Sequence, residues 1–471
     1  MKKLALNFIG KVLIGFSFLF LFPELVCFLY HENFISFLIP QVMSIILGFL
    51  FYRIQSDNRN FSVKDGFFIV SVSWILISIL GALPLYFNGD CNYIDAFFEI
   101  VSGFTTTGAT IFKDVEHLNH SILFWRSFSH FIGGMGVLAF VMAVIPLSAK
   151  DKSMHLLKAE MPGPHVEKLV PGIKKTLFYL FFIYFGLTIV EFFLLLVGGM
   201  RIFDALLISF GTAGTGGFSV LNTSLATYSN FCKIVVTLFM FLFGVNFNLY
   251  FLLLMKDFKN IFRSEELKVY IGLFLTSVII VFISTYQLFS NVWEALLQSG
   301  FHVSSLMTST GYSIGDINIY PTNCRVLMIL LMLISACAGS TCGGFKISRL
   351  IICFKDILRS IRNIISPNRV ESILFEGQKV SDSTVKSTNT FLFLYVILIV
   401  GIFYIVSLDG FSFETTLNSV ICTFANVGLC FQIENFSMFS DLSKLVLSFG
   451  MLLGRLEIFP VLSLFVDFKR S

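Results

Sequence analysis

The stretch Thr105-Thr106-Thr107-Gly108-Ala109-Thr110 decides the fold of this 471-residue chain. It follows the largely apolar segment 97–101 and contains no side chain suited to acid–base chemistry. It offers backbone carbonyls, threonine hydroxyls and one glycine, which can adopt dihedral angles that other residues avoid. Such a row of oxygen dipoles can replace the water shell of a cation, as in the selectivity filter of an ion channel.

Similar stretches recur three times along the chain. They are Thr215-Gly216-Gly217-Phe218, Thr310-Gly311-Tyr312-Ser313 and Asn426-Val427-Gly428-Leu429. The glycines at 108, 216, 311 and 428 are 216 − 108 = 108, 311 − 216 = 95 and 428 − 311 = 117 residues apart. One Thr/Gly run is usually only a loop, but recurrence at a period of about 100 residues indicates an internal repeat, which determines the whole fold.

The composition is that of a membrane protein. The chain is 56% hydrophobic and 13% charged, with 59 phenylalanines, whereas soluble domains contain about 25% charged residues. The nine cysteines form no C-x-x-C pair, and we interpret them as small buried hydrophobes rather than metal ligands or disulfides. The N-terminal Met1-Lys2-Lys3 precedes a long apolar run without a small-residue cleavage site, which predicts an uncleaved first span.

The apolar runs predict an N-terminal hairpin followed by four copies of one unit. Segments 6–30 and 34–52 are each long enough to cross about 30 Å of hydrocarbon, and three residues join them. Each later unit has a full span, a short apolar segment that re-enters, a filter-like loop and a returning span. The full spans are predicted at 66–87, 177–196, 269–286 and 390–406, the re-entrant segments at 93–104, 204–210, 294–307 and 414–424, and the returning spans at 122–147, 234–255, 326 onward and 445–465.

The predicted fold class is therefore an all-α polytopic membrane protein in which four pseudo-repeated units surround one pore. The hairpin occupies residues 1–60, and the pore units occupy 61–150, 151–260, 261–370 and 371–471. Irregular backbone at membrane depth is tolerated only where it is buried in protein or lines water. The four filter-like loops are accordingly expected to meet at a common axis.

Each re-entrant segment begins near an acidic residue, namely Asp95, Asp204, Glu294 and Glu414. A carboxylate suits the positive N-terminal end of a helix, so the negative C-terminal end points at the filter loop, where it favours a cation. Four ordinary N-terminal caps would give the same pattern.

The basic residues predict the orientation in the membrane. Six lysines lie between positions 150 and 175, four basic residues between 256 and 268 and seven between 349 and 386, whereas the loops beside the filters hold few, such as Lys113, Arg201 and Arg325. Short cytoplasmic loops are enriched in Lys and Arg, so both termini are expected in the cytoplasm and the filters open outward. The basic stretch from Lys355 to Arg369 lies between two spans, which argues against a nucleic-acid partner.

Together with these loops, a set of motifs in the returning spans resembles the Trk/Ktr/HKT family of potassium transporters, in particular the Trk-type membrane subunit, over nearly the whole chain. The motifs are Trp125-Arg126-Ser127, Gly133-Gly134-Met135-Gly136, Gly244-Val245-Asn246-Phe247-Asn248, Ala338-Gly339-Ser340-Thr341-Cys342-Gly343-Gly344 and Gly454-Arg455. The N-terminal hairpin is extra to the four-unit core.

The resemblance implies a potassium filter at the four loops. The expected filter residues are Thr106, Thr107, Gly108, Gly214, Thr215, Gly216, Ser309, Thr310, Gly311, Asn426, Val427 and Gly428. The family associates serine in place of the first filter glycine with sodium-permeable plant members, so Gly108 implies potassium; sodium or mixed monovalent cation uptake is the alternative. The fourth loop departs from the family pattern, because Leu429-Cys430 stands where proline and glycine are expected.

The resemblance also implies an obstruction below the filter, formed by a flexible glycine-rich loop and an arginine. The expected gate residues are Gly339, Ser340, Thr341, Gly343, Gly344, Lys346 and Arg455. Close helix packing would explain the small residues equally, and a structural salt bridge would explain a charge at membrane depth. Arg126 is interpreted as a snorkelling or bridging residue, His130 as a hydrogen-bonded packing residue, and Asn246 and Asn248 as partners for backbone groups.

Partners and location follow from the same resemblance. It implies a multi-pass protein of the bacterial cytoplasmic membrane, a homodimer with one pore per protomer, and a separate cytoplasmic nucleotide-binding regulatory subunit, since the chain has no G-x-G-x-x-G segment. Potassium is the expected substrate, and no tightly bound cofactor is expected. An enzyme is not expected because H-E-x-x-H, G-x-S-x-G and paired intramembrane aspartates are absent from the sequence, and a receptor or scaffold would not need four re-entrant segments.

The orientation can be tested by labelling. A cysteine introduced as Lys158→Cys should react with a membrane-impermeant maleimide only after cells are permeabilised, because the lysine-rich loop faces the cytoplasm. Lys113→Cys, beside the first filter, should react in intact cells. Labelling of position 158 in intact cells above the wild-type background would reverse the predicted topology.

Overall fold

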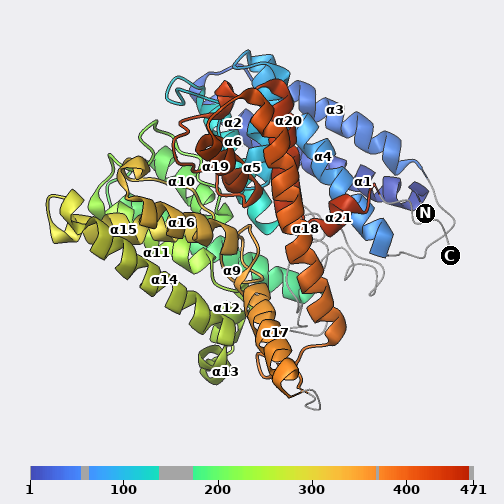
Figure 1. Ribbon diagram of the computed structural model, residues 1–471. Coiled ribbons are helices and arrows are strands. Elements are labelled where there is room, and N and C mark those ends of the chain that lie inside the picture. Colours follow the sequence, from blue (N-terminus) through green and yellow to red (C-terminus); the bar gives the residue numbers. More distant parts are fainter. Residues whose placement is uncertain (1, 55–62, 137–172, 367–370, 466–471) are drawn as a thin grey trace.

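The computed structural model describes residues 2–54, 63–136, 173–366 and 371–465, almost all of them in helices or the loops between them (Figure 1). The strands in this part are β1 (Leu374–Phe375) and β2 (Gln378–Lys379), which pair antiparallel. Six helices of the described residues are long and apolar enough to cross a membrane, or seven if one bent pair counts as a single span. The predicted all-α polytopic class is confirmed.

The N-terminal hairpin has two antiparallel arms. One arm is α1 (Lys2–Ser17), a 3₁₀ turn η1 (Phe18–Phe20) and α2 (Leu21–Tyr30), and the other is α3 (Ile35–Tyr52). The arms touch at Gly10 and Gly48, where a Cβ on Gly10 would stand 2.6 Å from the Gly48 carbonyl oxygen. Small residues allow such close backbone contact between membrane helices.

Four repeats follow, each with a long helix, a half-helix and a returning helix. The first repeat contains α4 (Val63–Asn88), α5 (Tyr93–Phe104) and α6 (His120–Met135); the second α9 (Ile173–Val197), α10 (Ile202–Gly214), α11 (Asn230–Phe243) and α12 (Phe247–Leu254); the third α14 (Glu265–Thr285), α15 (Val292–Met307), α16 (Thr322–Ile334) and α17 (Ile347–Ile365); the fourth α18 (Asp382–Val406), α19 (Phe413–Phe424), α20 (Asp441–Arg455) and α21 (Phe459–Leu462). Shorter elements are α13 (Phe258–Arg263) and the 3₁₀ turns η2 (Tyr286–Leu288), η3 (Ile317–Ile319), η4 (Ser407–Asp409) and η5 (Phe436–Met438).

The acidic residue of each half-helix lies in its first turn rather than at the cap. Asn92, Asn291 and Ser412 are the capping side chains of α5, α15 and α19, and each accepts a backbone N–H three residues on. The carboxylates therefore remain free for other partners. Asp95 pairs with Lys444 of α20 at 2.5 Å, which joins the first repeat to the fourth.

The second and fourth returning helices are broken where the sequence predicts uninterrupted spans, whereas the third is interrupted after Ile334 by the glycine-rich loop, as predicted. Segment 234–255 was expected as one span, but α11 and α12 bend by 93° around Gly244. Segment 445–465 breaks after Arg455, where Glu457 and Ile458 have positive φ. Helix α6 ends at Met135, and the rest of its predicted span, to 147, lies outside the described residues together with most of the lysine-rich loop. Apolar composition continues across these breaks and conceals them.

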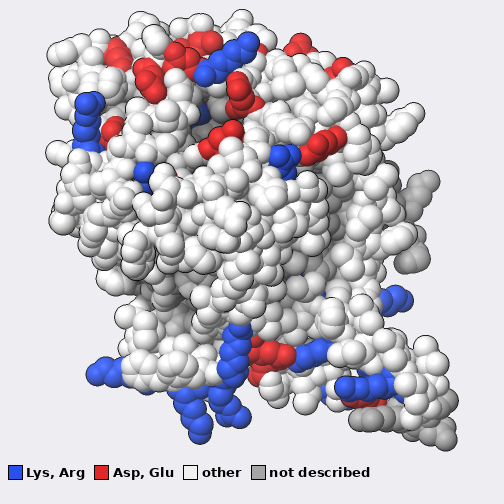
Figure 2. Space-filling view, turned by 60° about the vertical axis from the view of Figure 1, so that its left-hand side comes forward, with Lys and Arg blue, Asp and Glu red and all other residues white. Residues whose placement is uncertain are grey.

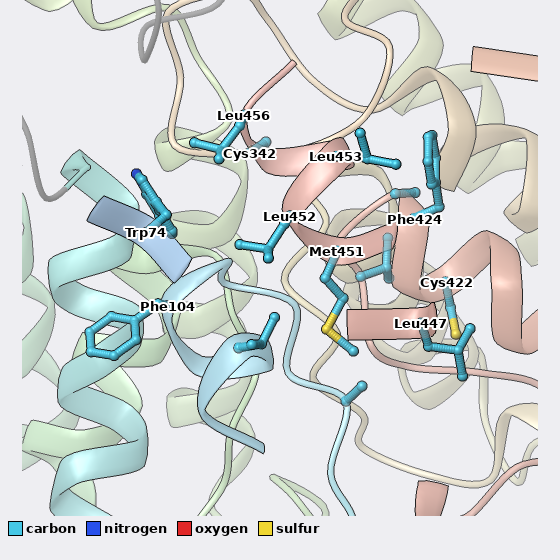
Figure 3. Close-up of a cluster of buried hydrophobic side chains, with 14 of the residues drawn as sticks. Trp74, Phe104, Cys342, Cys422, Phe424, Leu447, Met451, Leu452, Leu453 and Leu456 are labelled. Atoms are coloured by element: carbon cyan, nitrogen blue, oxygen red, sulfur yellow. The ribbon is translucent and has the colours of Figure 1, made fainter. Parts of the chain in front are cut away.

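The half-helices are surrounded by the long helices. Trp125 of α6 stacks on Phe20, contacts Phe104 of α5 edge-on, and donates its indole N–H to the Gly81 carbonyl at 2.9 Å. In the fourth repeat, Cys422 lies beside Leu447 and Phe424 lies beside Leu453, so α19 packs along α20 (Figure 3). Exposed apolar side chains such as Phe178, Ile279 and Phe393 then form a surface suited to lipid.

The interpretation of all cysteines as isolated thiols is wrong for one pair. Cys422 and Cys430 form a disulfide, which sequence spacing without a C-x-x-C pattern did not indicate. The other cysteines are free, and all but the half-buried Cys91 are buried, as expected for small hydrophobes.

Charge is segregated between the two ends of the molecule. Figure 2 shows most of the acidic side chains at the upper end, together with some Lys and Arg, and a row of Lys and Arg side chains with few acidic ones at the lower end. The lower end in Figure 1 contains α13 and the end of α17, which include Lys259, Arg263 and Arg362.

Candidate functional site

Every half-helix passes into its loop by the same hydrogen bond. The backbone N–H groups of Thr107, Gly216, Thr310 and Val427 each donate to the carbonyl five residues earlier, at 2.8 Å in all four repeats. Those acceptors are Ser102, Gly211, Ser305 and Cys422. The four loops therefore share one backbone structure, and this hydrogen bond shows which residues of the four loops are equivalent.

Backbone dihedrals confirm that register and correct the sequence alignment in the second repeat. In each loop a left-handed residue lies two positions before a glycine of positive φ. The left-handed residues are Thr106, Thr215, Ser309 and Asn426, with φ from 53° to 56°, and the glycines are Gly108, Gly217, Gly311 and Gly428. The residue equivalent to Gly108 is therefore Gly217 and not Gly216, so the predicted second-loop set of Gly214, Thr215 and Gly216 is displaced by one residue. The adjacent glycines 216 and 217 made the two registers indistinguishable in the sequence.

The four loops touch in a closed ring. A Cβ on Gly108 would stand 1.8 Å from the carbonyl oxygen of Gly216, and one on Gly217 would stand 2.1 Å from that of Thr310. A Cβ on Gly311 would stand 2.0 Å from the carbonyl oxygen of Val427, and one on Gly428 would stand 2.2 Å from that of Thr107. Each glycine Cα thus packs against a carbonyl of the next loop, and the fourth loop meets the first. Any side chain at these positions would push a carbonyl out of place.

A second ring of hydrogen bonds joins the segments that follow the four loops. Asn222 accepts from the Val115 N–H and donates to Asp114 (2.8 Å each), and the Leu225 N–H donates to the Ser313 carbonyl (3.0 Å). Gln432 N–H donates to Asn318, and Phe436 N–H donates to the Thr110 carbonyl, both at 2.8 Å. The hydrogen bond from Asn222 is the main cause of a lowered pKa of the exposed Asp114 carboxyl.

Two cationic side chains lie on the other side of the ring, against a glycine-rich loop. The Arg455 guanidinium donates to the carbonyls of Thr341 at 2.6 Å, Gly134 at 3.0 Å and Gly133. The buried Lys346 ammonium donates to the Cys342 carbonyl and to Ser340. Both expected gate cations therefore bind segment 339–344, and Arg455 spans from that loop to the end of α6.

The loop itself is inserted between the broken returning helices. Cys337 N–H donates to the Gly244 carbonyl and Phe247 N–H to the Gly339 carbonyl, both at 3.1 Å. Gly343 N–H donates to Ser309 of the third filter loop at 2.9 Å. A cavity of ≈ 30 Å³ lies among Gly134, Phe247, Thr341 and Arg455. That is the volume of about one water molecule, so this cavity is too small for a hydrated ion.

Comparison with known proteins agrees with this architecture. The family described as TrkH, cation transport protein, matches residues 32–470. The chain belongs to the TrkH family. It is therefore a membrane protein of a cation-transport family and not an enzyme.

Individual relatives match over almost their whole length. The chain is 32% identical to the Trk system potassium uptake protein TrkG of Escherichia coli, covering 95% of this chain and 94% of that protein. It is 32% identical to the E. coli TrkH protein, covering 97% of both. The crystal structure of the potassium transporter TrkH from Vibrio parahaemolyticus superposes with a TM-score of 0.89, at 26% identity and 99% coverage of both chains.

A buried ion pair fixes the first loop of this TrkH-family chain, in a way the sequence indicated only in part. Arg126 pairs with Glu99 of α5 at 2.7 Å, with side chains 2% and 0% exposed. Glu99 also accepts from the Ile111 N–H at 2.9 Å and the Thr110 hydroxyl at 3.0 Å. Of the two interpretations of Arg126, bridging is confirmed and snorkelling is wrong. Glu99 was missed, although a carboxylate in an otherwise apolar half-helix was a visible signal.

The remaining polar predictions are confirmed for two of three residues. His130 contacts the Gly103 carbonyl through Nδ1 at 2.8 Å and accepts from the Phe218 N–H through Nε2 at 3.3 Å, so it supports the second loop from behind. Asn246 caps α12 by accepting the Asn248 N–H at 3.0 Å. The role expected for the Asn248 side chain stays a prediction. Glu457 pairs with Arg349 at 2.6 Å rather than with Arg455.

The Glu99–Arg126 pair should be a large contributor to stability. Glu99→Gln leaves the buried Arg126 charge without its counterion and should lower the free energy of unfolding by about 3–5 kcal/mol, as expected when one partner of a buried pair is removed. Thermal unfolding of the purified protein in detergent measures the change.

An exposed pair provides the matched control. Arg362 pairs with Glu371 at 2.7 Å, and its side chain is 52% exposed, so Arg362→Gln should cost less than about 1 kcal/mol. Equal losses in the two variants would contradict a special role for Glu99.

Proposed function

We propose that this chain takes up potassium across the cytoplasmic membrane of a bacterium, through a filter formed by its four loops. The observation that supports this most directly is the closed ring of glycine–carbonyl contacts, in which each loop provides one quarter. The proposed filter residues are those predicted from the sequence, with Gly217 replacing Gly214 in the second loop. The curated relatives are named Trk system potassium uptake proteins.

The electrostatics of the ring suit a monovalent cation. All four half-helices end at the filter, so their negative C-terminal ends point toward it, and backbone carbonyls offer oxygen ligands in place of water. Among the described residues, no group of three or more His, Cys, Asp or Glu side chains could hold a metal ion. A carbonyl ring without carboxylates favours a weakly hydrated cation, which can enter and leave readily.

We further propose that segment 339–344, Lys346 and Arg455 form the gate. They lie on the opposite side of the filter from the second ring of hydrogen bonds, and each cation donates to a carbonyl of the same glycine-rich loop. A fixed positive charge in the path of a cation raises the barrier to its passage, since like charges 4 Å apart repel by about 4 kcal/mol at an effective dielectric of 20. Opening then requires the loop and Arg455 to move together.

We propose the orientation from the distribution of charge and the partners from the family resemblance. The Lys- and Arg-rich end in Figure 2 suits the cytoplasmic face, and a disulfide beside the filter suits the outer, oxidising side. Family resemblance supports a homodimer and a separate nucleotide-binding regulatory subunit on the cytoplasmic face. Potassium is substrate rather than cofactor.

Flux through purified protein in liposomes tests the proposal. Liposomes loaded with potassium should take up external radioactive rubidium, which stands in for potassium. External potassium should reduce this uptake far more than external sodium does. Equal competition by the two ions would support sodium or mixed-cation uptake instead. Absence of any cation flux, in protein that is folded and inserted, would refute the proposed function.

Selectivity should depend on Gly108. Gly108→Ser places a Cβ at the Gly216 carbonyl oxygen, 1.8 Å away before any shift, and so forces that carbonyl out of the ring. The sodium-to-potassium permeability ratio should rise about tenfold, equivalent to about 1.4 kcal/mol of lost discrimination, because three loops remain intact.

Gly89→Ser is the matched control for this substitution. Gly89 has φ 84°, close to that of Gly108 at 80°, but nothing lies within 4 Å of a Cβ there. It should therefore share the backbone strain and leave the permeability ratio unchanged. An unchanged ratio in folded Gly108→Ser protein would remove Gly108 from the proposed filter.

Arg455 should limit the flux. Arg455→Gln removes the charge and the bonds to the Thr341 and Gly134 carbonyls, so potassium flux per inserted molecule should rise by about tenfold or more, each 1.4 kcal/mol of barrier being worth about a factor of ten. Arg455→Lys keeps the charge and should keep most of the barrier. Wild-type or lower flux in well-inserted Arg455→Gln protein would show that Arg455 is not the barrier.

A further inference from the structure

A disulfide bond closes the fourth filter loop. Cys422 lies in the last turn of α19 and Cys430 lies two residues after Gly428, and their disulfide joins Cα atoms 6.0 Å apart across a sequence separation of 8. The bond encloses Asn426, Val427 and Gly428. It therefore connects the half-helix to the irregular segment that follows the filter glycine, which is called the outgoing strand below although it is not a β-strand.

In the first repeat the half-helix and the segment after the filter are connected differently, from a position one turn earlier in the half-helix. Thr110 follows Gly108 by two residues, as Cys430 follows Gly428, and its hydroxyl donates to Glu99 of the half-helix α5 at 3.0 Å. Glu99 accepts from the Ile111 N–H as well, at 2.9 Å. The strand leaving the first filter is thus held to its half-helix by hydrogen bonds.

The third repeat uses equivalent positions again. His302 lies three residues before Ser305, as Glu99 lies three residues before Ser102, so the two occupy equivalent positions. The His302 Nε2 accepts from the Ile314 N–H at 3.5 Å. Ser305, the acceptor residue itself, donates its hydroxyl to the Tyr312 carbonyl at 2.6 Å. Side chains of α15 therefore hold the third outgoing strand at two points.

The fourth repeat has replaced this polar connection. Ser419 stands in the position of Glu99 and His302, but its short hydroxyl donates to the Thr416 carbonyl within α19. Cys422 stands in the position of Ser305, and its carbonyl accepts from the filter N–H groups of Val427 at 2.8 Å and Gly428 at 3.2 Å. The disulfide adds a side-chain bond from this residue to the outgoing strand.

The ring has four seams, which are the contacts between one loop's glycine and the next loop's carbonyl. The residues enclosed by the disulfide form two of them. The Val427 carbonyl packs on Gly311, and Gly428 packs on the Thr107 carbonyl. Asn426 also donates to the Thr107 hydroxyl at 2.9 Å. A shift of this strand would therefore disturb the carbonyls that face both the third and the first loops.

We propose that the Cys422–Cys430 disulfide is a positioning element of the filter, which fixes the fourth strand so that the ring discriminates potassium from sodium. The inference rests on the proposed function, because it assumes that the ring selects the ion. Leu429-Cys430, the departure from the expected proline and glycine, is thereby explained as part of a braced loop.

Thiol counting tests the bond without reference to transport. The chain has nine cysteines, two of them in the disulfide and seven free. Protein purified without reductant and alkylated in denaturant should bind seven alkyl groups, and nine after dithiothreitol. The dithiol gives two electrons and two protons to the S–S bond and becomes a cyclic disulfide. Nine groups without reductant would overturn the proposal and leave the proposed uptake function untouched.

Flux measurements test the consequence. Cys422→Ser, Cys430→Ser and the double variant should each lower the potassium-to-sodium permeability ratio by the same factor, about tenfold for about 1.4 kcal/mol of lost discrimination, because each removes the same bond. Cys324→Ser, at a buried free thiol of α16, is the matched control and should leave the ratio unchanged.

Reduction of the wild-type protein removes the dependence on variant folding. Dithiothreitol should lower the ratio in wild-type liposomes as the substitutions do, and should have no effect on the double variant. An unchanged ratio in protein shown by alkylation to be reduced would overturn the proposed role. Absence of potassium flux in the untreated wild type would instead refute the proposed function, and the thiol count would still report on the bond.

Discussion

The contact between a glycine Cα and the carbonyl oxygen of the next loop is the constraint on which the rest of this structure depends. It occurs at four seams and brings backbones closer than any side chain would permit. Backbone at such a place cannot form a regular helix, so each half-helix must end before it and each loop must be held from outside. Glu99, His130 and Ser305 are buried polar residues that bond to the loops in this way.

The four loops reach the same backbone shape with different side chains. Glu99 with Arg126, His130, His302 with Ser305, and the Cys422–Cys430 bond each hold one outgoing strand or its neighbour. The conserved element among the repeats is the i − 5 hydrogen bond and the pair of positive φ values. The ring is fourfold in its backbone and asymmetric in the chemistry that supports it.

Much of this organisation could be predicted from the sequence because it depends on local composition. The half-helix at 93–104 was predicted with the bounds of α5, since apolar length and the following threonines define it. Breaks at Gly244 and after Arg455 could not be predicted, because the residues on both sides are apolar. The register at Gly217 and the partner of Cys422 depend on how the backbone of each loop turns after its half-helix, which composition does not encode. The departure at Leu429-Cys430 was visible, but its meaning was not.

The fourth-to-first seam also sets an order of assembly. Asn426 bonds to Thr107 across 319 residues, and Phe436 bonds to Thr110. Since synthesis proceeds from the N-terminus, the first loop is made before the other three, and the fourth loop that contacts it is made last. A nascent or truncated chain therefore has an incomplete ring, and the proposed ion path is complete only when the C-terminal repeat is inserted. Under the proposed function, the membrane becomes permeable to the ion only once the polypeptide is finished.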